Sequence, residues 1–273
     1  MMTSVDSFDS RPIGIFDSGV GGISVANAIR QCMPNEQLIY VADTINAPYG
    51  EKSDEFIYQR MAYISQRLLQ HDVKAIVVAC NTATTAAIAR LRSEFNLPII
   101  GVEPGIKPAV LATKTGVIGV LATPRTLKTP AFANLTQRFS GQAKVLLQPC
   151  PDLVLQIETL AFASKTMDSS LNSYIKPLLN QGADTLVLGC THYNFIAKQI
   201  AVKAGPEVTI IRTEMAVAKC LQQKLYMESK LSTEHPLGQA VFITSGDPLL
   251  FKQQVNALWQ VKADLANLEI KSL

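Results

Sequence analysis

The sequence has 273 residues, enough for one large domain or two modest domains with a buried core. Hydrophobic residues make up 48% and charged residues 17%, which is ordinary for a globular α/β protein and excludes a disordered chain. The formal net charge of +3 is too small to indicate binding to nucleic acid or to a membrane surface.

The first hundred residues alternate between apolar runs and amphipathic stretches, a pattern that predicts strand followed by helix. A glycine-rich turn, Asp17–Gly22, separates the first strand from the first helix, and Ser53 is placed to cap the second helix. We expect strands at 12–16, 37–42, 73–79 and 97–102, and helices at 23–32, 54–71 and 81–95.

The same alternation begins again after a break near Pro104–Pro108. Here we expect strands at 116–122, 143–147, 185–189 and 208–211, and helices at 126–138, 152–162, 168–181, 194–204 and 213–228. Pro177 should disturb the third of these helices. After a polar link, Ser229–Gly238, a last strand at 239–244 and a helix at 251–259 are expected to return to the first half.

Strands that alternate with helices over short connections predict an α/β fold with mostly parallel sheets and helices on both faces. Because the pattern runs twice, we expect two pseudo-symmetric α/β lobes. The first would comprise 1–104 plus 215–273 and carry Asp17 and Cys80, and the second would comprise 105–214 and carry Cys190 and His192. Since ligands of such folds bind beyond the carboxyl ends of the strands, an active site in the cleft between the lobes is expected.

Cys80 and Cys190 each stand where an apolar strand ends and a helix is expected to begin. Backbone N–H groups at a helix N-terminus stabilise a thiolate, so either cysteine could act as a base near neutral pH. The competing interpretation is that both are core residues at tight turns. We interpret the other three cysteines as structural: Cys32, Cys150 and Cys220.

Each of the two thiols has a plausible partner. His192 lies two residues after Cys190 and titrates near neutrality, although a lone histidine is more often structural. Asp17 would serve Cys80 in the same way if the first and third strands are neighbours, and it could equally cap a helix. Tyr49 could supply a hydroxyl from a turn, whereas Glu158 has the pattern of a solvated charge on an amphipathic helix.

Several other kinds of site are disfavoured. The count of five cysteines is odd and their spacings are wide, which argues against disulfides, and with three histidines and no C-x-x-C pair a metal site is not expected. The turn Asp17–Gly22 lacks the last glycine of a dinucleotide motif and the lysine of a P-loop, although its N–H groups could hold a small carboxylate. The polar, acidic start of the chain predicts no signal peptide, and Lys114 interrupts the best apolar run, so we expect a cytoplasmic protein.

Six short motifs connect this sequence to a known family. The chain resembles bacterial glutamate racemases of the aspartate/glutamate racemase superfamily over nearly its whole length. Any one motif would be weakly specific, but all six occur in the family's order. They are Ile15–Gly22, Ala42-Asp43-Thr44 with Pro48-Tyr49-Gly50, Cys80–Thr84, Gly101–Pro104, Leu188–Tyr193 and Thr244–Pro248.

The resemblance implies that two opposed cysteines interconvert L- and D-glutamate without a cofactor and so supply D-glutamate for peptidoglycan synthesis. Cys80 would deprotonate D-glutamate and Cys190 L-glutamate, with Asp17 and His192 assisting. Glu158 occupies the position of a family acid with a possible accessory role. The resemblance assigns substrate binding to Asp17, Ser18, Pro48, Tyr49, Gly50, Asn81, Thr82, Thr191 and His192.

The sequence departs from the family pattern at three places. Asn194 stands where a proline is usual, Ile211-Arg212-Thr213 replaces an Ile-Asp-Ser-like segment, and Thr129–Phe132 replaces Ser-x-x-Tyr. None of these positions carries an implied proton-transfer group. The departures therefore concern oligomer contacts, activation or packing around the site.

Two alternatives remain open. The chain could racemise aspartate or another amino acid, although three of the motifs are of the glutamate type. It could also be a non-catalytic module that binds a small ligand at its glycine turn. For partners we expect the small molecule glutamate, no nucleic acid and no membrane, with the chain as a homodimer or in a monomer–dimer equilibrium.

Overall fold

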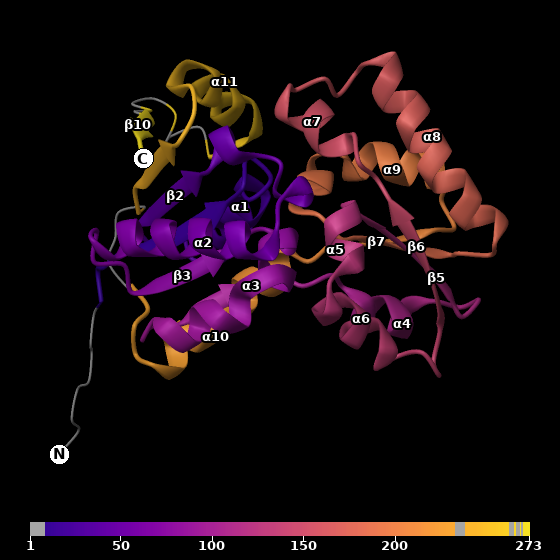
Figure 1. The fold of residues 1–273 in the computed structure, drawn as a ribbon, viewed down its shortest axis with the longest axis horizontal. Coiled ribbons are helices and arrows are strands. Elements are labelled where there is room, and N and C mark those ends of the chain that lie inside the picture. The colour runs from indigo at the N-terminus through magenta and orange to yellow at the C-terminus, as the bar shows by residue number, and fades with distance from the viewer. Residues whose placement is uncertain (1–8, 233–237, 262–264, 266–267, 269) are drawn as a thin grey trace.

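The computed structural model describes residues 9–232, 238–261, 265, 268 and 270–273. It contains two parallel β-sheets (Figure 1). The larger sheet comprises β1 (Ile13–Asp17), β2 (Leu38–Ala42), β3 (Ala75–Val78), β4 (Ile99–Gly101), β9 (Ala240–Thr244) and β10 (Ile270–Ser272). Its order is β10-β9-β2-β1-β3-β4, and every adjacent pair is parallel. Because β9 pairs with β2, the end of the chain returns to the sheet with which it began.

The smaller sheet has four strands, again all parallel. They are β5 (Val117–Ala122), β6 (Lys144–Pro149), β7 (Thr185–Leu188) and β8 (Thr209–Ile211). Their order is β6-β5-β7-β8. We call the larger sheet with its helices the first lobe and the smaller sheet with its helices the second lobe. The division at residues 104/105 and 214/215 stays a prediction.

Helices cover both faces of each sheet, which explains why the strands are apolar on both sides. In the first lobe, α1 (Ile23–Cys32), α10 (Glu214–Met227) and α11 (Pro248–Leu258) pack on one face, and α2 (Asp54–Leu69) and α3 (Asn81–Glu94) on the other. In the second lobe, α7 (Leu153–Glu158), α8 (Lys165–Asn180) and α9 (Ala197–Ala204) share one face. The opposite face is covered by α4 (Ile106–Ala112) and α6 (Pro130–Gln137).

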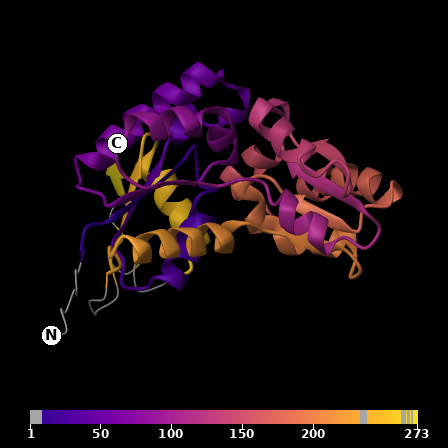
Figure 2. The same cartoon turned by 90° about the horizontal axis from the view of Figure 1, so that it is seen from below.

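The two lobes lie side by side (Figure 2). The described residues also form three short 3₁₀ helices. Two follow β2, η1 (Thr44–Asn46) and η2 (Tyr49–Glu51), and one follows β7, η3 (Thr191–Ile196). The predicted fold class, an α/β protein of two lobes with parallel sheets, is therefore confirmed.

Most predicted elements are present within a few residues, and the exceptions have local causes. The helix expected at 126–138 is two helices, α5 (Pro124–Lys128) and α6, because Pro130 has no N–H and Thr129 caps a new helix by accepting the N–H of Phe132. The helix expected at 152–162 ends at Glu158, before Leu160 with its left-handed φ of 56°. The sequence analysis missed α4 and β10, while α8 continues through Pro177.

A buried ion pair within the first lobe leads to a stability prediction. Lys74 Nζ lies 2.6 Å from Glu36 Oε2 with both side chains almost fully buried. Lys74→Met should therefore lower the free energy of unfolding by about 3–5 kcal/mol, because the buried Glu36 charge loses its ion-pair partner and keeps only the hydrogen bond from the N–H of Ser232. Chemical denaturation measures this loss. The matched Lys203→Met change breaks an exposed pair with Asp168 and should cost about 0–1 kcal/mol. Equal losses in the two variants would contradict the prediction.

Candidate active site

Cys80 is positioned by the junction of β3 and α3 at the boundary between the lobes. It is the N-cap residue of α3, and its Sγ accepts a hydrogen bond from the backbone N of Ala83 at 3.4 Å. Ser18 Oγ lies 3.7 Å from the same sulfur. Because β1 is the neighbour of β3, with Phe16 opposite Val78, the turn after β1 is brought beside the thiol. The neighbouring strands that the sequence analysis required for a Cys80–Asp17 pairing are therefore present.

Asp17 ends β1 and is completely buried. Its Oδ2 accepts the backbone N–H of Gly22 at 2.8 Å, so the carboxylate also fixes the glycine turn at the start of α1. Its Oδ1 has no hydrogen-bond partner among the residues that the structure describes. Burial raises the pKa of Asp17 above its ordinary value, since the charged form is poorly solvated there. Asp17 can therefore cap the turn before α1 through Oδ2 and still act on the Cys80 thiol through Oδ1.

The surroundings of Cys80 disfavour its charged form when no substrate is present. Burial raises the pKa of the Cys80 thiol well above its usual value. The negative charges of Asp17 and Cys190 raise that pKa further. Cys190, although it belongs to the second lobe, is therefore close enough to Cys80 to influence its ionisation.

Cys190 is held differently from Cys80. It follows β7 and precedes η3, a 3₁₀ helix of six residues, and α9 begins only at Ala197. A helix does begin after Cys190 as expected, but it is a 3₁₀ helix rather than an α-helix. Within the described residues its side chain accepts no capping hydrogen bond, and its Sγ lies 3.7 Å from His192 Nδ1. The imidazole, rather than a helix, is the partner of this sulfur.

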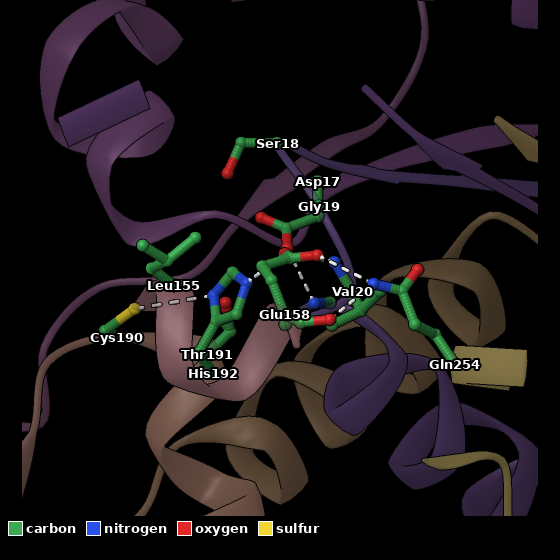
Figure 3. A network of polar contacts seen from close by, with 12 residues as sticks. Asp17, Ser18, Gly19, Val20, Leu155, Glu158, Cys190, Thr191, His192 and Gln254 are labelled. Carbon is green, nitrogen blue, oxygen red and sulfur yellow. Dashed lines mark hydrogen bonds and ion pairs between the residues drawn. The ribbon is translucent and has the colours of Figure 1, made fainter. Parts of the chain in front are cut away.

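His192 and Glu158 form a buried pair behind Cys190 (Figure 3). His192 Nε2 donates to Glu158 Oε1 at 2.6 Å. Burial alone would lower the pKa of His192, but Cys190 and Glu158 outweigh that effect and hold the pKa well above its ordinary value. The interpretation of Glu158 as a solvated surface charge is wrong, because its side chain is only 14% exposed and it also accepts from the N–H of Val20.

Three predicted substrate-binding residues of the first lobe have distinct environments. The Tyr49 hydroxyl donates to Asp43 Oδ2 at 2.6 Å, so it is already committed within its own lobe. Gly50 lies beside Thr123 of the second lobe. A Cβ added at Gly50 would lie 3.4 Å from the Thr123 Cβ, an ordinary van der Waals contact. Pro48 lines a cavity of about 230 Å³ between the lobes, with Glu158 also in its wall.

Three further predicted residues follow the two cysteines directly. Asn81 Nδ2 donates to the carbonyl of Val102, and its buried Oδ1 has no partner among the described residues. Thr82 Oγ1 lies 3.0 Å from Thr123 Oγ1 across the boundary between the lobes. The backbone carbonyl of Thr191 accepts from the hydroxyl of Ser24 at 3.1 Å.

Four residues that were not predicted from the sequence join the lobes at this site. Thr123 and Thr126 complete a triangle of hydroxyls with Thr82. Ser24 Oγ accepts from Nδ2 of Asn194, the residue that stands where the family usually has proline. Gln254 Nε2 donates to the backbone carbonyl of Glu158 at 2.7 Å. Thr123 and Thr126 could have been predicted as site residues, because they follow the end of a strand. Gln254 lies within a helix, and no feature of the sequence marks it as a site residue.

The remaining cysteines lie elsewhere. Cys150 is buried in the core of the second lobe and its carbonyl accepts from the Tyr193 hydroxyl. Cys32 is half-buried at the end of α1, and Cys220 is exposed on α10. Within the described part of the chain, no three His, Cys, Asp or Glu side chains gather where they could hold a metal ion. No described helix has both the length and the apolar character needed to cross a membrane.

Comparison with known proteins identifies the family. A family model described as Asp/Glu/Hydantoin racemase matches residues 23–220. A glutamate racemase from Ectopseudomonas mendocina (strain ymp) is 47% identical over 252 residues, covering 89% of this chain and 95% of the relative. The solved glutamate racemase from Francisella tularensis subsp. tularensis SCHU S4, in complex with D-glutamate, is 30% identical with a TM-score of 0.83, covering 96% of this chain and 98% of that one.

A second solved structure agrees. The Escherichia coli glutamate racemase in complex with L-glutamate and the activator UDP-MurNAc-ala is 28% identical with a TM-score of 0.82, and the match covers 96% of this chain and 97% of that one. The family model and the curated relative each span most of the present sequence. This chain therefore belongs to the Asp/Glu/hydantoin racemase family, and the relatives reported above are glutamate racemases.

Proposed function

We propose that this protein interconverts L- and D-glutamate by moving the α-proton between two thiols, without a cofactor. The observation that carries the proposal is the pair Cys80 and Cys190. Each is buried at the end of a strand of a different lobe, and each has its own acid–base partner. Inverting a stereocentre by proton transfer needs a base on one face and an acid of similar strength on the other. Two thiols from opposing lobes meet that requirement.

In the proposed reaction, the Cys80 thiolate removes the α-proton of D-glutamate and the Cys190 thiol protonates the opposite face. The reverse direction starts with the Cys190 thiolate and L-glutamate. Asp17 stands beside Cys80 and His192 contacts Cys190, so each thiol has a group that exchanges its proton. The ammonium group of the substrate would lower the pKa of a buried thiol, because an opposite charge favours the thiolate.

The polar groups around the thiols support the binding of an amino acid. Asn81 Oδ1, which has no partner among the described residues, is an acceptor for the ammonium group, and the hydroxyls of Ser18 and Thr191 are donors for carboxylates. The Thr82 hydroxyl is engaged by Thr123 and Thr126, so Thr82 would contribute its backbone N–H. Since the Tyr49 hydroxyl is engaged by Asp43, its contribution would be its backbone, together with Gly50 and Pro48. The relatives crystallised with D-glutamate and L-glutamate support glutamate over aspartate as the substrate.

Membership of the family also supports a proposal for the cellular role and the oligomeric state. We propose that the product D-glutamate supplies peptidoglycan synthesis in the cytoplasm and that the chain acts as a homodimer or in a monomer–dimer equilibrium. Size-exclusion chromatography with light scattering measures the oligomeric state directly.

Incubation in D₂O with no added cofactor tests the proposed reaction. L-Glutamate should yield D-glutamate that carries deuterium at Cα, because the second thiol delivers a solvent-derived proton. Chiral chromatography and mass spectrometry detect this product. A parallel incubation with L-aspartate should give much less conversion. If neither product nor exchange is found with glutamate, the proposal is wrong, and preferential conversion of aspartate would establish the alternative substrate.

A further inference from the structure

Gln254 connects the last helix of the chain to the acid–base pair behind Cys190. It lies in α11 of the first lobe and is only 3% exposed. Its Nε2 donates to the backbone carbonyl of Glu158 at 2.7 Å and lies 3.3 Å from Glu158 Oε2 (Figure 3). One amide therefore holds both the backbone and the carboxylate of a residue in the opposite lobe.

The position of Glu158 depends on these contacts from the first lobe. Glu158 is the last residue of α7, a helix of six residues, and Leu160 two positions later adopts a left-handed φ of 56°. The donors that reach its side chain from outside the second lobe are the N–H of Val20 on Oε1 and the amide of Gln254 on Oε2. Glu158 Oε1 in turn accepts from His192, whose other nitrogen faces Cys190.

Thr82 beside Cys80 also meets Thr123 across the boundary, but among the described residues no hydrogen bond from the second lobe reaches Asp17 or Cys80 themselves. Asp17 is fixed by the N–H of Gly22 in its own lobe, five residues away in the sequence. The groups that surround Cys80 closely, Ser18 and Ala83, are also from the first lobe. Losing Gln254 should therefore disturb the Cys190 half of the reaction and leave the Cys80 half intact.

We propose that Gln254 is a positioning residue that orients Glu158, and through it His192, for proton transfer by Cys190. This proposal rests on the two-thiol racemisation proposed above. According to this proposal, α11, which follows the polar segment 229–238, contributes to proton transfer on the face of the substrate that Cys190 contacts. Gln254 touches neither thiol, so its effect must pass through Glu158.

The variant that tests this role is Gln254→Met, which keeps the side-chain volume and removes the amide donor. Without the donor, Glu158 loses a hydrogen bond of the charge-assisted kind, and we expect kcat/KM to fall by about 10- to 100-fold. The fall must be equal for L- and D-glutamate, since enantiomers have equal free energies and the equilibrium constant is unity. Rates alone therefore do not reveal which face is affected.

Primary isotope effects with α-deuterated glutamate do reveal the face. If the Cys190 step becomes limiting in Gln254→Met, the isotope effect on kcat/KM rises for L-glutamate, whose deuteron Cys190 removes. It falls toward unity for D-glutamate, whose deuteron Cys80 removes before the limiting step. Asp17→Asn should show the opposite pattern. An unchanged or equally changed pair of isotope effects in Gln254→Met would overturn the proposal.

Two controls separate positioning from general loosening. Gln199→Met removes a similar bond, from Gln199 Nε2 to the carbonyl of Phe162, but within one lobe, and should leave rates and isotope effects unchanged. In a Glu158→Gln background, Gln254→Met should have little additional effect, because Gln254 acts through Glu158. Fully additive losses would contradict the proposed route.

Folding and the underlying function are checked independently. Circular dichroism melting establishes that Gln254→Met is folded. Gln254→Leu, which is close in volume and has no hydrogen-bonding group, serves as the second variant, with the same opposite changes expected in the two isotope effects. If the wild-type protein does not exchange the α-proton of glutamate, the proposed function fails. If the wild-type protein exchanges the α-proton but neither folded variant changes the isotope effects for L- and D-glutamate in opposite directions, only the role of Gln254 fails.

Discussion

Replacing Cys80 or Cys190 with alanine should each lower glutamate racemisation by about 10³-fold or more while the protein stays folded. Each substitution removes the proton carrier of one face, and a positioned acid or base contributes about 10²- to 10⁴-fold to such a step. Both faces are needed in either direction, so the two variants should be equally inactive. A circular dichroism assay of glutamate enantiomers over time measures the rates.

The matched control is Cys220→Ala. Cys220 is exposed on α10, away from the boundary between the lobes, so its replacement should leave the rate unchanged. If Cys80→Ala or Cys190→Ala kept near-normal turnover, the thiol in question would be a packing residue, as the competing interpretation of the sequence holds. The alanine variants should also fail to exchange the α-proton of the enantiomer that their missing thiol deprotonates.

Gly21→Ala should lower the rate by about 10²-fold, because its methyl group would displace the His192 ring. A Cβ at Gly21 would lie 2.2 Å from His192 Nδ1 and 2.6 Å from Cε1, distances that real Cβ atoms do not adopt. His192 Nδ1 is the nitrogen that faces Cys190, so the clash acts on the proton-transfer pair itself. Misplacing a catalytic group by about 1 Å is sufficient for a loss of this size.

Backbone strain does not contribute to this prediction, since Gly21 is not among the glycines with positive φ. Gly141→Ala is the control, because an added Cβ there meets no atom within 4 Å. Steady-state kinetics on both variants, with thermal melts to confirm folding, make the comparison. Normal activity in Gly21→Ala would show that the position of the His192 ring is not needed for turnover.

The two thiol sites are similar in sequence and different in structure. Both follow an apolar strand, yet Cys80 accepts a hydrogen bond from the start of an α-helix and Cys190 relies on His192. Asp17 is buried with one carboxylate oxygen that has no hydrogen-bond partner among the described residues, whereas Glu158 accepts from donors of both lobes. Variants should therefore damage the two faces selectively, which the isotope effects are designed to detect.

The sequence predicted the local features of this protein well. Apolar runs that end in Asp17, Cys80 and Cys190 mark strand ends, and α1 has the predicted bounds, Ile23–Cys32. Ser53 caps α2 as expected, because its hydroxyl accepts from the N–H of Phe56. These features depend on residues close together in the chain, where hydrophobic periodicity and capping act directly. The α/β class and the candidate cysteines followed from them.

Only the tertiary structure decided which distant residues meet. Glu158 has the pattern of a surface residue on an amphipathic helix, but packing of the lobes places it between His192 and Gln254, which lies 96 residues further along the chain. Tyr49 looked like a free hydroxyl until Asp43 was found to accept from it. The sequence by itself determined most of the strands and helices and the two candidate thiols. How polar side chains from separate lobes satisfy one another depends on the docking of the two sheets, which no local pattern encodes.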